Sequence, residues 1–475
     1  MKGENMKKKL YCILLSLAMV ITMMPAMSFT AYAAEDHNDN WVYLSKAMAG
    51  EAQSSVAGAI DVTNNASTGV RTIKLLTNIS SGAGDPEALE IPAGKKIVLD
   101  LNGYVLSRGP GVFAEGSYGK GSVILNQGDL TIIDSNTGKQ THRFTPGNYY
   151  WTLDEENGTE TLSGGVITGG SGYAFDTASS GGGILSYGNK SVLTIEGGNI
   201  VGNNSYDGGG VYAKDITMTG GKIIGNYALA GGGILPVGRL LMSGGEISNN
   251  VSAGMGGGIS LENADLSVLT GGKIVHNIAK TNGAYAGGVC SYSTDAKLIL
   301  GGDVVIDGNT STKNPSMDNL YWSDGEVRIG DGTDMNDVVA NGYIIPKPTD
   351  GFKAGLRTAA NNESSLHVLS AEPDQVKYFF SDNPEYYVVF NNNATAGDAS
   401  DDYLELKKIT GSEHTVNVGN IDNGAVYTDR QVSTSGTEIH LTVVPDVGYK
   451  LKSLKWYTTN KESATDITES KSFSM

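Results

Sequence analysis

Three aromatic residues stand beside acidic residues in the segment THRFTPGNYYWTLDEENGTE, residues 141–160. Tyr149, Tyr150 and Trp151 are followed closely by Asp154 and then by two glutamates. Aromatic rings present flat apolar faces and carboxylates accept hydrogen bonds from hydroxyl groups, so this combination suits the recognition of sugar rings. We therefore predict a carbohydrate-binding site at these four residues. The alternative is that the aromatic side chains only pack over the surface of the fold, because aromatic residues more often bury area than bind ligands.

Patterns for other chemistry are missing from the sequence. There is no His-Glu-x-x-His, no Gly-x-Ser-x-Gly and no pair of cysteines at metal spacing, and the six histidines are scattered. The double glycines do not continue as a phosphate-binding loop, which needs Gly-Lys-Ser or Gly-Lys-Thr at its end. We therefore expect no catalytic residue, no metal site and no cofactor.

An internal repeat defines the elements around this segment. The motif Gly-Gly-x-Ile, or Gly-Gly-x-Val, recurs at steps of 33, 23, 24, 27 and 30 residues. In four units an isoleucine stands three residues after the first glycine and an asparagine stands six residues after it. These asparagines are Asn203, Asn226, Asn250 and Asn277. A second run of three glycines follows 11 or 12 residues after the first motif glycine in the tightest units.

The residues around each motif alternate between apolar and polar, which is the period of a β-strand. Leu193, Ile195 and Ile200 are one such set. Strands this short cannot bury a core alone, but they can do so by stacking on the next unit. We therefore predict an all-β fold of the parallel β-helix type, with glycines of positive φ at its corners. The four asparagines are predicted to stack as a structural ladder of amide hydrogen bonds.

The stretch before these units carries further motifs. They are Ile91–Lys95 (IPAGK), Leu99–Gly103 (LDLNG), Leu130–Ser135 (LTIIDS) and SGGVITGG at residues 163–170. On these motifs the chain resembles glycine-rich right-handed parallel β-helix proteins of bacterial surfaces. The alternation of Gly-Gly-Gly-Ile with Ile-x-x-Asn is also similar to the repeat pair of polymorphic membrane proteins, a family of adhesins. These resemblances span about residues 40–408 and imply a right-handed parallel β-helix (solenoid) in an adhesin-like protein.

The same fold class, which is pectin-lyase-like, also includes enzymes that degrade polysaccharides. Such an enzyme needs acidic residues from neighbouring units to converge as an acid–base pair or as calcium ligands. In this sequence the acidic residues occupy no equivalent position of the repeats, and Arg239 is the only arginine between residues 144 and 327. We therefore favour binding without catalysis. A polysaccharide lyase or glycoside hydrolase is the first alternative, and a passive surface stalk is the second.

The N-terminal sequence predicts export. Three lysines, an apolar run and the small residues Ala31 and Ala33 are typical of a secretory signal peptide, here residues 1–33. Residues 34–72 are expected to form a capping segment. Within it, "WVYLSKAMAGEAQSSVAG" places three apolar residues at helical spacing, which predicts a short helix over the first coil.

The β-helix is expected at residues 73–408, with regular glycine-rich coils at about 162–310 and irregular final coils after them. The following segment, residues 409–475, contains GTEIHLTVVPDVGYKLKSLKW. It resembles the small β-repeats of internalin-type surface proteins and implies a C-terminal β-repeat domain that stops before its last strand. The expected location is therefore outside the cell, at the bacterial surface or cell wall.

Charge and hydropathy narrow the range of partners. The formal net charge is -17, which disfavours nucleic acid as a partner. Beyond the signal peptide, no run of about 18 apolar residues predicts a membrane span. The expected partners are carbohydrate or the surface of a host or neighbouring cell, and the oligomeric state is left open.

Overall fold

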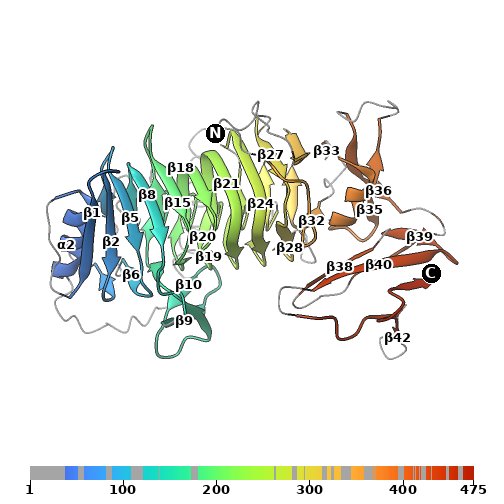
Figure 1. Cartoon of the computed structure of the whole chain (residues 1–475), viewed down its shortest axis with the longest axis horizontal. Helices are drawn as coiled ribbons and strands as arrows, with labels where there is room; N and C mark the ends of the chain where they lie inside the picture. Colours follow the sequence, from blue (N-terminus) through green and yellow to red (C-terminus); the bar gives the residue numbers. More distant parts are fainter. Residues whose placement is uncertain are drawn as a thin grey trace, which may run out of the picture. The chain divides into compact units, whose positions relative to one another are not determined.

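The computed structural model describes residues 38–51, 58–81, 88–108, 121–138, 140–172, 180–261, 264–280, 286–291, 293, 295–312, 318–322, 326–332, 344–357, 367–369, 371–393, 401–409, 411, 413–416, 418, 424–428, 431–445, 449–457 and 464–474. Over these ranges the chain is nearly all β, with a large and mostly parallel sheet of 27 strands (Figure 1). The all-β prediction is therefore confirmed. The expected signal peptide, residues 1–33, lies outside the described residues.

The strands of the large sheet form three rows, in which each strand pairs with one strand from the preceding unit and one from the following unit. The first row consists of β1 (Ile60–Asn65), β2 (Val70–Leu75), β5 (Lys96–Asp100), β8 (Asp129–Ile133), β15 (Val192–Ile195), β18 (Val211–Met218), β21 (Ile234–Ser248), β24 (Leu266–Val275), β27 (Lys297–Leu300), β31 (Glu326–Ile329) and β33 (Val368–Leu369). Within this row β1 and β2 are antiparallel and the later pairs are parallel.

The second row shares the long strands β21 and β24 with the first row, and the third row shares β18 and β21 with it. The second row adds β3 (Ile79–Ser80), β6 (Val105–Ser107), β12 (Val166–Thr168), β16 (Asn199–Val201), β19 (Lys222–Ile224), β28 (Val305–Asp307), β32 (Lys353–Leu356) and β34 (Phe379–Ser381). The third row adds β4 (Leu89–Ile91), β7 (Ile124–Asn126), β14 (Ile184–Ser186), β23 (Ile259–Ser260), β26 (Val289–Ser291) and β30 (Leu320–Trp322).

A separate parallel sheet of six short strands follows the asparagine positions of the repeat. It consists of β13 (Ser171–Gly172), β17 (Asn204–Ser205), β20 (Tyr227–Ala230), β22 (Val251–Met255), β25 (Ile278–Ala279) and β29 (Thr310–Ser311). We call it the small parallel sheet. Each of its strands therefore follows a second-row strand along the chain.

The N-terminal helix α2 (Asn38–Met48) is the one that the apolar spacing predicts. Trp41, Leu44 and Ala47 are buried, and so is Met48 at its end. The helix packs against β3 and β4, at the start of the large sheet. It therefore covers apolar side chains that the first unit would otherwise leave in water.

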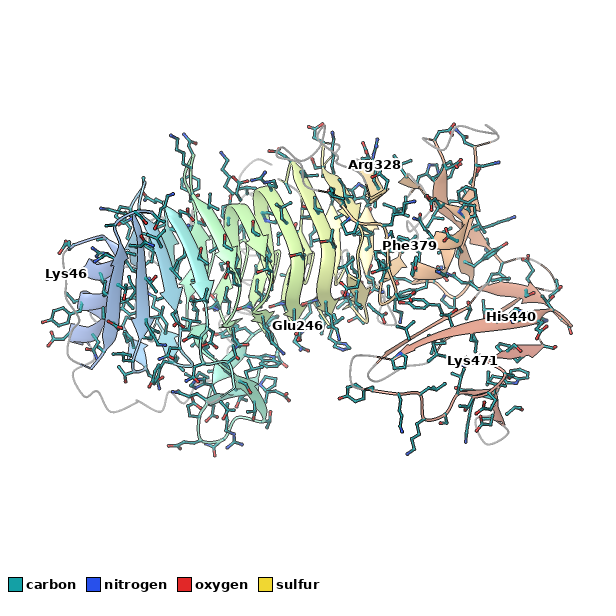
Figure 2. The ribbon with its side chains drawn as sticks, in the orientation of Figure 1. Lys46, Glu246, Arg328, Phe379, His440 and Lys471 are labelled. Atoms are coloured by element: carbon teal, nitrogen blue, oxygen red, sulfur yellow. The ribbon has the colours of Figure 1, made fainter. Side chains whose placement is uncertain are left out.

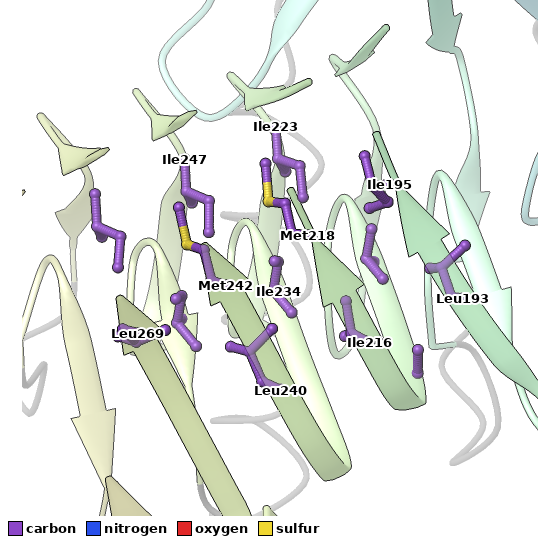
Figure 3. Packing of buried hydrophobic residues seen from close by; sticks show 14 of the residues in the cluster. Leu193, Ile195, Ile216, Met218, Ile223, Ile234, Leu240, Met242, Ile247 and Leu269 are labelled. Atoms are coloured by element: carbon purple, nitrogen blue, oxygen red, sulfur yellow. The ribbon is translucent and has the colours of Figure 1, made fainter. Parts of the chain in front are cut away.

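Buried apolar side chains stack from unit to unit. Ile195, Met218 and Met242 occupy one position in the first row, where they pair across successive strands. Ile223 and Ile247 stack in the same way in the second row (Figure 3). All five side chains are buried. Full burial of one such side chain stabilises the folded state by about 1.5–3 kcal/mol, so the stacking of neighbouring units supplies the core that no single unit has.

The glycine runs make room for the isoleucine and asparagine of the next unit. A Cβ on Gly210 would lie 2.7 Å from Cγ2 of Ile223 and 3.1 Å from Nδ2 of Asn226. A Cβ on Gly233 would lie 2.9 Å from Cγ2 of Ile247 and 3.1 Å from Nδ2 of the following asparagine. The glycine run of one unit is thus in contact with the isoleucine and asparagine of the next unit.

The four repeat asparagines form a continuous chain of hydrogen bonds. Nδ2 of Asn203 donates to Oδ1 of Asn226 at 3.0 Å, and the bonds from Asn226 to Asn250 and from Asn250 to Asn277 measure 2.9 Å. The backbone N–H of each donor residue also points to the same oxygen, at 2.9–3.0 Å. The second Nδ2 hydrogen is used as well, for example from Asn226 to the carbonyl oxygen of Ile200 at 3.0 Å. These buried amides therefore have their donors and acceptors satisfied.

The chain of asparagines extends beyond the four residues that the repeat marks. Asn277 donates to Asn309 and Asn309 donates to Asn319, each at 2.9 Å. It ends at Asp382, whose two oxygens accept the backbone N–H of Asn319 at 2.6 Å and its Nδ2 at 2.7 Å. Burial raises the pKa of Asp382 to about 7, while the bonds from Asn319 act in the opposite direction.

The aspartates of the LDLNG and LTIIDS motifs hold turns of adjacent units together. Asp100 accepts the backbone N–H of Ser135 at 2.9 Å. Asp134 accepts the backbone N–H groups of Gly103 and Gly165, both at 2.7 Å. These carboxylates therefore satisfy backbone donors at the corners, which is a structural task.

Antiparallel pairing replaces parallel pairing toward the C-terminus. The elements there are η1 (Pro373–Tyr378), β35 (Tyr386–Asn391), β36 (Tyr403–Lys408), β37 (Glu413–Thr415), β38 (Gly424–Thr428), β39 (Val432–Thr434), β40 (Glu438–Pro445), β41 (Lys455–Trp456), β42 (Thr465–Asp466) and β43 (Ser472–Ser474). The hydroxyl of Tyr427 accepts the N–H of Gly351 at 2.6 Å and donates to the carbonyl oxygen of Phe352 at 3.1 Å. Nε2 of Gln431 donates to the carbonyl oxygen of Phe379, a residue that is labelled in Figure 2. The segment after residue 409 is thus in contact with residues 351–379.

Candidate functional site

The segment that interrupts the repeat forms a small sheet of its own. β9 (Thr141–Pro146) pairs antiparallel with β10 (Trp151–Leu153) on one side and with β11 (Glu160–Ser163) on the other (Figure 1). The alternation of THRFTP makes this possible, because His142 and Phe144 are buried while their neighbours in β9 are exposed. We call residues 141–163 the inserted sheet.

Phe144 attaches the inserted sheet to the second row of the large sheet. Its side chain is buried against Val105, Val166 and Val201, which come from β6, β12 and β16. Trp151 packs partly against the same cluster. The valines alternate with residues that face the core, so they supply an apolar patch on the outer side of the row.

His142 gives the inserted sheet a second, polar attachment. Its Nε2 lies 2.9 Å from the carbonyl oxygen of Gly103, and its Nδ1 lies 2.7 Å from Oε1 of Glu155. A carbonyl oxygen can only accept, so Nε2 carries a proton. The other oxygen of Glu155 accepts the backbone N–H of Arg143 at 3.1 Å. This glutamate of the aromatic–acidic segment is therefore engaged inside the inserted sheet.

Trp151 is used for packing. Its backbone N–H donates to the carbonyl oxygen of Gly225 at 2.8 Å. A Cβ on Gly225 would lie 2.3 Å from Cγ of the Trp151 ring, so the ring lies directly on this glycine. The side chain is half-buried. For Trp151 the structure thus favours the alternative of packing over the surface.

Asp154 holds the turn between β10 and β11. It accepts the backbone N–H of Asn157 at 2.9 Å and the hydroxyl of Thr145 at 3.2 Å. The bond from Asn157 is the main reason why the pKa of Asp154 lies below its usual value. Within the described part of the chain, no hydrogen bond links this carboxylate to the three aromatic residues of the prediction. The structure therefore does not join Asp154 with them in one cluster.

Tyr149 lies at the edge of the inserted sheet and remains 48% exposed. Its ring meets the ring of Tyr227 edge to face, with centroids 5.1 Å apart. Nζ of Lys280 lies over the Tyr149 ring, 5.3 Å from its centroid, and donates to the carbonyl oxygen of Asn148. Tyr227 begins β20 and Lys280 follows β25, so both partners come from the small parallel sheet.

Tyr150 points to the same sheet. Its hydroxyl forms a hydrogen bond with the side chain of Asn204 in β17, and burial raises the pKa of this tyrosine. Oδ1 of Asn204 also accepts the hydroxyl of Ser171 at 2.8 Å. Burial in turn lowers the pKa of Lys280.

The structure thus brings together two of the four predicted binding residues and three that the sequence did not indicate. The group consists of Tyr149, Tyr150, Asn204, Tyr227 and Lys280, and we call it the Tyr149 surface. The three added residues could not be found from the segment itself. A signal exists only in the repeat, where Asn204 and Tyr227 each follow a ladder asparagine directly.

Two acidic residues on the regular units pair with basic residues of neighbouring units. Asp215 lies 3.8 Å from Arg239, and Glu246, which is labelled in Figure 2, lies 3.0 Å from Lys222. Asp207 is different, because it stands before a glycine corner and burial raises its pKa to about 6. Across the residues with described positions, no three His, Cys, Asp or Glu side chains form a group that could hold a metal ion.

No family model matches the chain, and neither a curated protein nor a solved structure matches it. In the part of the chain with described positions, no helix is long and apolar enough to cross a membrane. What the Tyr149 surface can do therefore follows from its own side chains. They offer an exposed aromatic ring, a hydroxyl, an amide and an ammonium group.

Proposed function

We propose that residues 73–408 form a right-handed parallel β-helix of the pectin-lyase-like type. Three observations support this fold. The three strand rows recur in the same order in successive units, the glycine runs admit the side chains of the next unit, and the asparagines bond in a continuous ladder. A chain that returns to the same three rows every 23 to 32 residues buries its core between units.

The proposed role is that of a secreted, adhesin-like protein of the bacterial surface that binds carbohydrate without catalysis. The sequence features that favour export and the internalin-type segment at residues 409–475 support this location. Two acidic residues of the regular units, Asp215 and Glu246, support binding over catalysis, because each pairs with a basic side chain of a neighbouring unit.

The observation that carries the proposal is the exposed ring of Tyr149, held in place by Tyr227 and Lys280. Sugar rings bind to aromatic side chains through their C–H faces, and a fixed ring loses little conformational entropy on binding. Asn204 and Lys280 can hydrogen-bond to hydroxyl groups beside the ring. Trp151 and Asp154 support the segment instead of contacting the sugar.

The test combines a glycan array with an assay for polysaccharide degradation, both on purified residues 34–475. We expect glycan binding without release of reducing or unsaturated products. The variant Tyr149→Ala should lose this binding by about tenfold or more, since it removes the stacking face. Tyr187→Ala is the matched control, because Tyr187 is 53% exposed and lies outside the Tyr149 surface.

Other outcomes decide between the alternatives. Release of unsaturated or reducing sugars would replace the adhesin proposal with a polysaccharide-degrading enzyme. If the protein neither binds a glycan nor degrades a polysaccharide, a passive surface stalk is favoured. Equal loss of binding in Tyr149→Ala and Tyr187→Ala would remove the Tyr149 surface from the proposal.

A further inference from the structure

Lys280 is a cation without a carboxylate partner in the part of the chain that the structure describes. Two lysines of the strand rows do have one, Lys222 with Glu246 at 3.0 Å and Lys353 with Asp307 at 2.6 Å. Nζ of Lys280 instead donates to a backbone carbonyl, that of Asn148, and lies over an aromatic ring. An ammonium group has three donors, so this geometry leaves two of them for a ligand.

Lys280 is a partly buried cation. Burial lowers its pKa, which means that the surroundings disfavour its charge. The chain as a whole has a net charge of -17, so its average field repels anions. The ammonium group of Lys280, which lies over the exposed Tyr149 ring, is therefore a local positive charge on a chain whose net charge is negative.

We propose that the Tyr149 surface selects acidic saccharides, in which a carboxylate or sulfate group on the sugar pairs with Lys280 while the sugar ring stacks on Tyr149. This inference rests on the carbohydrate-binding function proposed above and names the class of ligand. One ligand can reach both groups, because Nζ lies only 5.3 Å from the Tyr149 centroid. A charge-assisted hydrogen bond to a half-buried ammonium discriminates strongly against neutral sugars.

The experiment measures the affinity of residues 34–475 for three probes by titration calorimetry. They are an oligosaccharide of alternating glucuronate and N-acetylglucosamine, its carboxyl-reduced neutral form, and the sulfated derivative of that neutral form. We expect the acidic probes to bind about tenfold or more tightly than the neutral one, as expected for one hydrogen bond to a charged group. Binding of the acidic probes should also weaken as salt is raised.

Variants assign the effect to Lys280. Lys280→Met keeps the apolar stem and removes the charge, so it should lose about tenfold in affinity for the acidic probes and little for the neutral one. Lys280→Arg should restore the preference. Lys222→Met is the matched control, because it removes a lysine that is paired with Glu246 and lies outside the Tyr149 surface, so it should leave all three affinities unchanged.

The outcomes separate this inference from the proposed function. If the neutral and acidic probes bind equally, or if Lys280→Met retains the preference, the inference is wrong. The proposed function still stands in that case, provided that Tyr149→Ala loses binding. If no acidic probe binds at all, the inference is overturned, and the glycan array decides separately whether the surface binds neutral sugars. A preference for only the carboxylate or only the sulfate probe supports the inference and identifies the anion.

Discussion

At the scale of single residues, asparagine and aspartate do most of the polar structural work. A ladder asparagine satisfies the backbone N–H and the amide of the preceding unit with one oxygen, and a backbone carbonyl with its own Nδ2. Asp100 and Asp134 do the same for backbone donors at the corners. A short side chain with an acceptor oxygen can reach backbone N–H groups where the chain turns, and the asparagine amide adds a donor for backbone carbonyls.

Replacing Asn226 by Leu should be strongly destabilising. The change removes the acceptor of the buried backbone N–H of Asn203, and it takes one hydrogen bond each from Nδ2 of Asn203 and from the carbonyl oxygen of Ile200. Each stranded group costs about 1–3 kcal/mol, so a marked fall in the melting temperature is expected. Asn157→Leu is the control, since Asn157 is exposed in the inserted sheet. Equal melting temperatures for the two variants would contradict a structural ladder.

At the scale of elements, the repeat could be read from the sequence and the docking of the inserted sheet could not. The Gly-Gly-x-Ile spacing predicts parallel pairing of equivalent isoleucines, and the structure pairs Ile200 with Ile223 and Ile223 with Ile247. Local periodicity is enough for this, because each strand meets its own copy one unit later. Asn309 was missed because its distance from the double glycine changes, although the Ile-x-x-Asn spacing is kept.

The candidate site was only half predictable for a physical reason. The inserted sheet is placed by the burial of Phe144 against three valines from three different strands, which no local pattern encodes. Tyr227 and Lys280 become neighbours of Tyr149 only after that docking. Asp382 at the end of the ladder lies 63 residues from Asn319 along the chain and shares no motif with it.

Phe144→Ala should loosen the inserted sheet while leaving the strand rows folded. Truncating a buried phenylalanine costs about 3–5 kcal/mol, and here that loss falls on the docking of one small sheet. Faster amide hydrogen exchange is expected in residues 141–163, together with weaker glycan binding. Thr152→Ala, at an exposed position of β10, is the control. Unchanged exchange in Phe144→Ala would show that other contacts position the sheet.

At the scale of the whole molecule, the half-buried Asp207 and the buried Asp382 make stability depend on pH. Burial raises the pKa of Asp207 to about 6 and that of Asp382 to about 7, both above the ordinary value of 3.8. The unfolded chain releases these two protons near pH 4. The folded chain keeps them until the pH reaches about 6 for Asp207 and about 7 for Asp382. These groups stabilise the fold below about pH 4 and lose that contribution as the pH rises through their folded pKa values.

Asp207→Asn should raise stability at neutral pH and leave it unchanged near pH 4. The variant removes the cost of a half-buried charge, worth roughly 1 kcal/mol once solvent screening is allowed for. Thermal unfolding across pH 4 to 8 measures it, and the difference from the parent chain isolates this group. Asp215→Asn is the control, since that carboxylate faces Arg239 at the surface. A constant difference at all pH values would speak against titration of Asp207.

The asparagine ladder also has a direction. Each ladder oxygen accepts hydrogen bonds from the preceding unit, and each Nδ2 donates one hydrogen to the next side-chain oxygen of the ladder, so the amide dipoles add head to tail. The negative end is Oδ1 of Asn203, which receives the N–H of Gly170. The positive end is Asn319, and the carboxylate of Asp382 lies against it. The array therefore behaves like an α-helix whose positive terminus carries an acidic cap, although its dipoles come from side chains many residues apart.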